Sequence, residues 1–71
     1  MPPGWFALTP DEATATWDLH QPLIAAWQGP GEASVVLYAD GLIEVEGDGF
    51  PVDLLAHVSV AWHGWLRGKC A

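Results

Sequence analysis

The residues best spaced for acid–base chemistry are Asp53 and His57, which stand four positions apart. On a helix, side chains with this spacing are neighbours, so the carboxylate could orient the imidazole as a general base. The simpler interpretation is an ion pair on a helix surface. Serine chemistry has little support, because neither Ser34 nor Ser59 lies in a Gly-x-Ser-x-Gly elbow. The sequence therefore predicts a protein that is not an enzyme.

Metal and cofactor sites have equally little support. The single cysteine, Cys70, excludes a disulfide framework and a zinc site built from two cysteine pairs. His57 and His63 would lie about 120° apart around a helix, which prevents them from sharing a metal. The turn at residues 47–49 lacks the alternating oxygen ligands of a calcium loop, and residues 29–31 lack the lysine of a phosphate-binding loop. We expect no metal and no cofactor.

The strongest chemical signal is the distribution of charge. The chain has nine acidic residues and two basic ones, for a formal net charge of −7, and the first 66 residues contain no lysine or arginine. A surface of one sign repels nucleic acids and anionic lipids, and it attracts basic surfaces at long range. Arg67 and Lys69 lie near the end of the sequence, where they would complement the negative end of a helix dipole.

Most of the carboxylates cluster in the second half of the chain. Glu44 and Glu46 would project from the same face of a strand, about 6.5–7 Å apart. Phosphates along a nucleic-acid strand have a similar spacing, so a carboxylate row could occupy sites that a basic groove uses for phosphate. The predicted partner-binding residues are Asp40, Glu44, Glu46, Asp48, Asp53 and Glu32. Alternatively, these residues only keep a hydrophobic protein soluble and protect an edge strand.

The N-terminal half of the chain predicts a helix. Thr9 is placed to cap its free amides and Glu12 to complete a capping box. Apolar residues then recur at helical spacing and extend the pattern through residues 10–28. Pro22 should kink this helix, or divide it into two short helices, near His20 and Gln21.

The central part of the chain predicts a β-hairpin, with Asp40-Gly41 as a two-residue type I′ turn between residues 34–39 and 42–46. If Ala39 pairs with Leu42, the side chains that face the helices are those of Val36, Tyr38, Ile43 and Val45. The opposite face would carry Val35 and Leu37 beside Glu44 and Glu46. This opposite face would be half apolar and half acidic.

The C-terminal part predicts an amphipathic helix from Asp53 onward, because seven apolar residues fall within an arc of about 140°. A strand through residues 57–62 is the competing interpretation, since Val58, Val60 and Trp62 alternate there. Residues 1–8 form an N-terminal arm or a short strand. The overall prediction is one α+β domain over residues 1–71, with a Pro-kinked N-terminal helix, a two-stranded antiparallel hairpin and a C-terminal helix.

The sequence has no basic-then-apolar leader and no apolar run approaching the ~18 residues of a membrane span. We expect a cytoplasmic protein, located in the host cell if the chain is phage-encoded. Its partners should include neither membrane nor nucleic acid directly.

In profile the chain resembles the small acidic anti-CRISPR proteins of phages and mobile elements. The resemblance lies in its 71-residue length, its single domain and its carboxylates without nearby cations, which are Asp40, Glu44, Glu46, Asp48 and Asp53. Those proteins are mostly non-enzymatic inhibitors, and several mimic nucleic acid. The resemblance implies an inhibitor that binds a basic, nucleic-acid-binding surface of a partner, such as a CRISPR effector subunit.

The alternative function is a small protein-interaction module, such as a phage structural component, an antitoxin or an adaptor subunit. Such a module would dock through Val35 and Leu37, or through Val60 on the last helix. Its acidity would serve only solubility, and its oligomeric state is open.

Overall fold

The computed structural model describes residues 2–19, 21–47 and 49–70, with side chains as far as residue 68. This part of the chain forms a four-stranded antiparallel sheet, in the order β1-β2-β3-β4, and two helices. The elements are β1 (Phe6–Leu8), α1 (Pro10–Trp17), β2 (Leu23–Gln28), β3 (Ser34–Tyr38), β4 (Ile43–Glu46) and α2 (Leu54–Cys70). The predicted α+β class is confirmed, and the short N-terminal strand is β1.

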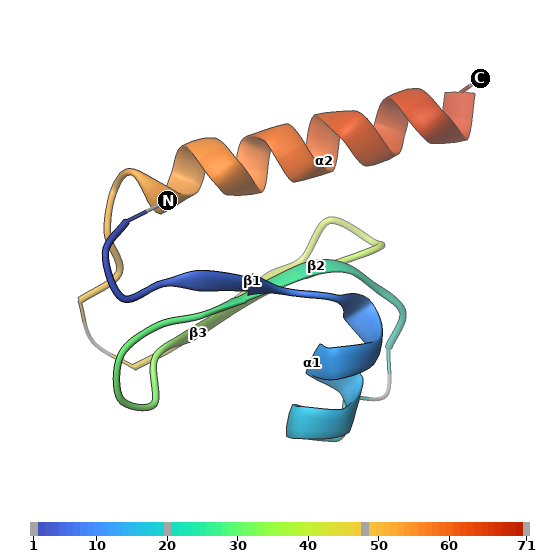
Figure 1. The fold of residues 1–71 in the computed structure, drawn as a ribbon. Helices are drawn as coiled ribbons and strands as arrows, with labels where there is room; N and C mark the ends of the chain where they lie inside the picture. The colour runs from blue at the N-terminus through green and yellow to red at the C-terminus, as the bar shows by residue number, and fades with distance from the viewer. Residues whose placement is uncertain (1, 20, 48, 71) are drawn as a thin grey trace.

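The two helices lie on opposite faces of the sheet (Figure 1). One hydrophobic cluster joins α2 to the sheet and includes Val35, Leu37 and Leu54. The other joins α1 to the sheet and includes Ala13 and Val36. All five residues of β3 are buried because this strand has a neighbour on each side and a helix over each face.

The predicted N-terminal helix is correct in its first half and wrong in its second. The capping box is confirmed: the Thr9 hydroxyl accepts from the Glu12 amide at 3.2 Å, and Glu12 Oε1 accepts from the Thr9 amide at 3.0 Å. However, α1 ends at Trp17, with Asp18 in the left-handed region at φ 50°. Residues 23–28 form β2 instead, and His20, at the expected kink, lies outside the described residues.

The error has a physical reason. A strand that is covered on both faces reads as a continuous apolar run, without the alternation that marks a half-exposed strand. An insertion at Ile24 further breaks the period of two, because Leu23 pairs with Tyr38 while Ala25 pairs with Leu37. The apolar residues of β2 therefore match helical spacing by accident.

The hairpin is confirmed, but its predicted register is wrong by one residue. Tyr38 N donates to the Leu42 carbonyl at 2.9 Å, and Gly41 N donates to the Tyr38 carbonyl at 3.0 Å. The loop thus has three residues and is closed by Gly41 at φ 92°. Asp40 does not take the positive φ that a type I′ turn requires, and its carboxylate accepts from Leu42 N at 3.0 Å.

The shift moves every side chain of β4 to the other face, because the side-chain period of a strand is two. Leu37 pairs with Ile43 on the α2 face, and Val36 pairs with Glu44 on the α1 face. Val35 is fully buried and Leu37 is 1% exposed, so neither is available for docking, contrary to the alternative function.

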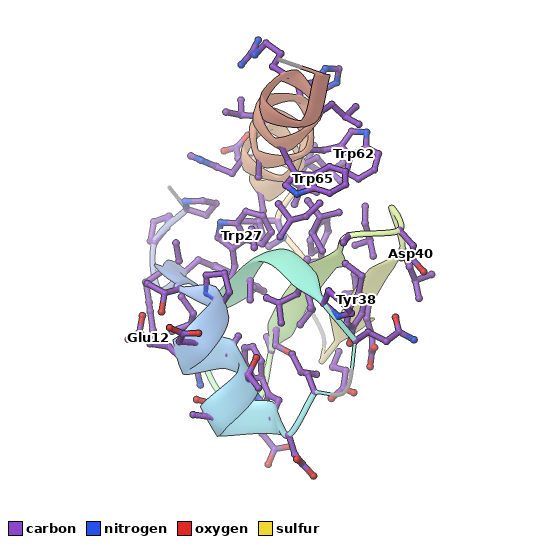
Figure 2. The ribbon with its side chains drawn as sticks, turned by 90° about the vertical axis from the view of Figure 1, so that its right-hand side faces the viewer. Glu12, Trp27, Tyr38, Asp40, Trp62 and Trp65 are labelled. Carbon is purple, nitrogen blue, oxygen red and sulfur yellow. The ribbon has the colours of Figure 1, made fainter. Side chains whose placement is uncertain are left out.

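The predicted C-terminal helix is confirmed as α2, and the strand interpretation of residues 57–62 is wrong. Leu54 and Val58 are buried against the sheet. Farther along, Trp62 stacks on Trp65 with ring centroids 5.5 Å apart, on the side of α2 that faces the sheet (Figure 2). The Trp62 indole also lies near the hairpin, where a Cβ at Gly41 would come within 3.4 Å of it.

Candidate functional site

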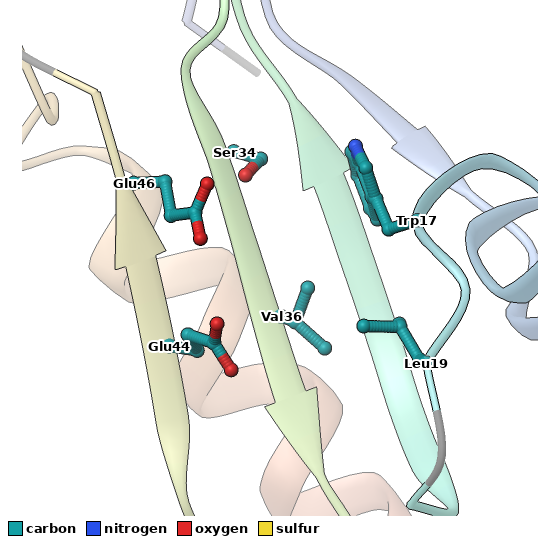
Figure 3. A pocket seen from close by; sticks show the side chains of 6 residues that line it. All are labelled: Trp17, Leu19, Ser34, Val36, Glu44 and Glu46. Carbon is teal, nitrogen blue, oxygen red and sulfur yellow. The ribbon is translucent and has the colours of Figure 1, made fainter.

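Glu44 and Glu46 form one wall of a groove on the α1 face of the sheet (Figure 3). They lie on the same face of β4 because they are two residues apart on one strand. The floor belongs to β3, and the opposite wall is formed by Trp17 at the end of α1 and by Leu19. We call this cavity, of about 180 Å³, the acidic groove; it is lined by Trp17, Leu19, Ser34, Val36, Glu44 and Glu46.

The lining of the acidic groove suits a basic side chain. Two carboxylates can accept charge-assisted hydrogen bonds from an ammonium or a guanidinium group. The indole of Trp17, on the opposite wall, can add a cation–π contact. The sequence's only lysine and arginine, Lys69 and Arg67, both belong to the end of α2, on the other face of the sheet.

Tyr38 holds one of the two carboxylates in place. Its hydroxyl donates to Glu44 Oε2 at 2.9 Å, and its side chain is only 5% exposed. Burial, and next the adjacent Glu44 carboxylate, raise the pKa of Tyr38 above its ordinary value. This hydrogen bond from the neutral hydroxyl fixes Glu44 at the edge of the groove.

The other predicted contact residues do not line the acidic groove. Asp40 lies in the β3–β4 loop, Glu32 in the β2–β3 turn and Asp53 immediately before α2, and all three are exposed. Asp48 lies outside the described residues. Of the predicted set, the groove thus brings together only Glu44 and Glu46.

Three groups near the carboxylates were missed by sequence reasoning: Trp17, Asp18 and Leu19. A second cavity of about 270 Å³ adjoins the acidic groove, with Leu19 and Glu44 common to both. Its lining includes Asp18, which adds a third carboxylate to this side of the molecule. The expectation of helical structure through residues 10–28, kinked or divided near His20 and Gln21, concealed these residues, although Pro22 and an aspartate, which tolerates the left-handed conformation, signalled an earlier end of the helix.

A third cavity lies on the other side of the hairpin, between β4 and α2. Ile43 and Leu55 contribute to it and are 43% and 51% exposed. We call this cavity, of about 300 Å³, the apolar groove; it is lined by Leu37, Gly41, Ile43, Leu55, Val58, Ser59 and Trp62. Since strand side chains alternate, β4 contributes carboxylates to one groove and Ile43 to the other.

The acid–base pair of the sequence analysis lies outside these three cavities. Asp53 is exposed at the start of α2 and His57 is half-buried on that helix, but neither lines any of the cavities described above. Among the described residues, no three histidine, cysteine, aspartate or glutamate side chains gather as a metal site would require. The candidate functional sites are therefore the grooves.

Neither helix of the described chain has the length and apolar character needed to cross a membrane. Comparison of the chain with protein-family models, curated proteins and solved structures gives no match. The function must therefore follow from the chemistry of the site.

Proposed function

We propose that this protein is a small non-enzymatic inhibitor, like the acidic anti-CRISPR proteins, that binds a basic, nucleic-acid-binding surface of a partner protein. The observation that supports the proposal is the pair Glu44 and Glu46, on one face of β4 and opposite Trp17. A lysine or arginine that normally contacts phosphate would meet carboxylates about 6.5–7 Å apart and an aromatic surface. A CRISPR effector subunit is one such partner.

The net charge of the whole chain supports the same function. A protein with a net charge of −7 attracts a basic groove over a distance and accelerates the encounter. That attraction is screened beyond about 8 Å at physiological ionic strength, so the affinity should fall steeply as salt is added. Occupation of the groove would then exclude nucleic acid without any chemical step.

The test is displacement of fluorescent nucleic acid from a panel of basic nucleic-acid-binding proteins that includes CRISPR effector subunits. We expect the native protein to displace nucleic acid from one member at a near-equimolar ratio. The double variant E44Q/E46Q should lose about tenfold or more in affinity, which corresponds to about 1.4 kcal/mol.

The matched control is the double variant E32Q/D53N, which removes the same amount of charge outside the acidic groove. It should retain affinity within about threefold. Equal losses in the two double variants would contradict a specific groove and favour bulk attraction. Cooperative thermal unfolding of each variant shows that the fold is kept.

A second candidate function, a small protein-interaction module, is favoured by the apolar groove. Since Val35 and Leu37 are buried, its docking residues would be Ile43 and Leu55, with Val60, which is 69% exposed, as a further candidate. Binding to a partner with little dependence on salt would favour this function over the first.

A further inference from the structure

We propose that β4 binds an extended segment of the partner as an additional strand of the sheet, and that this segment alternates basic and apolar residues. The inference rests on the proposed function and names the kind of segment that is recognised. It is carried by three features of β4: an open edge, outward backbone groups and side chains that point into two different grooves. In strand addition the first two features provide the main-chain hydrogen bonds, and the third provides specificity.

The first feature is the open edge. Among the strands of the described residues, β4 is the last of the sheet and pairs only with β3. All four of its residues are exposed, so its outer side is accessible in the described structure. The opposite edge of the sheet is less suitable, because β1 has three residues and is followed at once by the capped start of α1.

The second feature is the direction of the backbone groups. Tyr38 and Leu42 form a hydrogen-bonded pair, and such pairs alternate with non-hydrogen-bonded pairs along an antiparallel ladder. The pair of Ile43 with Leu37 and the pair of Val45 with Val35 are therefore non-hydrogen-bonded pairs. The N–H and C=O groups of Ile43 and Val45 consequently point away from β3, toward the open edge.

The third feature is the chemistry on the two sides of β4. Residues of an added strand would lie directly beside Glu44 and Glu46 on one face of the sheet, and beside Ile43 and Val45 on the other. Ile43 and Val45 are 43% and 46% exposed, so each has apolar surface left to cover. Basic residues fit the first face and apolar residues fit the second.

A second copy of this chain does not fit the same edge. A symmetric antiparallel pair keeps each face continuous across the two sheets, so in the registers that pair most of β4, Glu44 lies opposite Glu44 or Glu46 of the other copy. Four carboxylates would then gather on one face, and like charges opposite each other destabilise a strand pair. Charge complementarity therefore selects a basic segment from another protein.

The test uses a synthetic peptide in which lysine and valine alternate over the length of β4. Amide hydrogen exchange of the native protein should slow at Ile43 and Val45 when this peptide is added, because their N–H groups gain acceptors. A peptide of the same composition, with all lysines before all valines, should not slow exchange at these positions. Unchanged exchange at both amides with the alternating peptide would overturn the proposal.

The matched variants are Val45→Pro and Val45→Thr. Proline removes the outward N–H and is tolerated on an edge strand where that group faces solvent. We expect V45P to lose about tenfold or more in affinity for the alternating peptide, and V45T, which keeps the N–H, to lose about threefold or less. The exchange experiment uses the native protein, so it tests strand addition even if V45P unfolds.

The outcomes separate this inference from the proposed function. If E44Q/E46Q loses its partner but Ile43 and Val45 gain no protection from the peptide or that partner, strand addition is wrong and the inhibitor function stands. If the peptide protects both amides but no nucleic acid is displaced, strand addition stands and the inhibitor function is wrong. Protection of these two amides that grows with protein concentration in the absence of peptide would indicate that two copies of this chain pair through β4. That result would contradict the proposal that the added strand is a basic segment of another protein.

Discussion

Tyr38 connects the interior of the sheet with the candidate site. Its ring belongs to the hydrophobic cluster beneath α1, while its hydroxyl donates to Glu44 at the acidic groove. In the folded protein the neutral phenol is favoured, first by burial and next by the neighbouring carboxylate. A residue that packs on one side and positions a charge on the other links the stability of the fold to the geometry of the site.

The pKa of Tyr38 gives a direct prediction, because it is the only tyrosine in the chain. Its phenolate absorbance should appear above the ordinary pKa near 10 in the folded protein. The stability that follows is present below that pH and is lost as pH rises through the raised pKa. In E44Q the pKa of Tyr38 should fall but stay raised by burial; an unchanged titration would contradict the role of Glu44.

At the scale of elements, local chemistry set the start of α1 and the loop of the hairpin. Thr9 and Glu12 satisfy each other's backbone amides, and Asp40 accepts from the Leu42 amide. The capping box acts over three residues and was predicted from the sequence, whereas the Asp40 bond belongs to a three-residue loop that was predicted as a two-residue turn. The length of α1 was decided instead by tertiary structure, because residues 23–28 pair with the neighbouring strands of the sheet.

The capping box should make a measurable contribution to stability. Thr9→Ala should lower the free energy of unfolding by about 1 kcal/mol in urea titrations at neutral pH. Thr16→Ala is the control, because this hydroxyl is exposed, bonds only to the Glu12 carbonyl within the helix and should change stability little. A loss with Thr16→Ala as large as that with Thr9→Ala would contradict a specific cap.

The capping box should also make stability depend on pH. The hydrogen bonds from Thr9 lower the pKa of Glu12 below its ordinary value. Its contribution is therefore present above the ordinary glutamate pKa and is lost as pH falls through the lowered pKa. The free energy of unfolding of Glu12→Gln should decline less over that acid range than that of the native protein, and identical declines would contradict this assignment.

At the scale of the whole molecule, the fold depends on α2 staying docked on the sheet. A chain of 71 residues has a small margin of stability, and Leu54 is one of its fully buried side chains. α2 also forms one side of the apolar groove, through Leu55, Val58 and Trp62. The stability of the sheet and the shape of that groove therefore share the same contacts.

Truncation of Leu54 tests this dependence. Leu54→Ala should lower the free energy of unfolding by about 2–5 kcal/mol, because it leaves a cavity beneath α2. Leu55→Ala makes the same chemical change at a side chain that is 51% exposed, so it should cost much less. Equal losses of stability in the two variants, measured by urea unfolding, would contradict the observed orientation of α2.

Local patterns in the sequence determined the capping box, the C-terminal helix, the existence of the hairpin and the excess of negative charge. Each depends on residues a few positions apart or on composition alone. Only the tertiary structure decided that residues 23–28 form a strand, since burial on both faces removed the alternation that identifies one. It also decided the register of β4, because a single additional loop residue moved Glu44 and Glu46 to the face where Trp17 lies. The acidic groove was therefore predictable in its charges but not in its walls, which come from segments that meet only when the sheet is assembled.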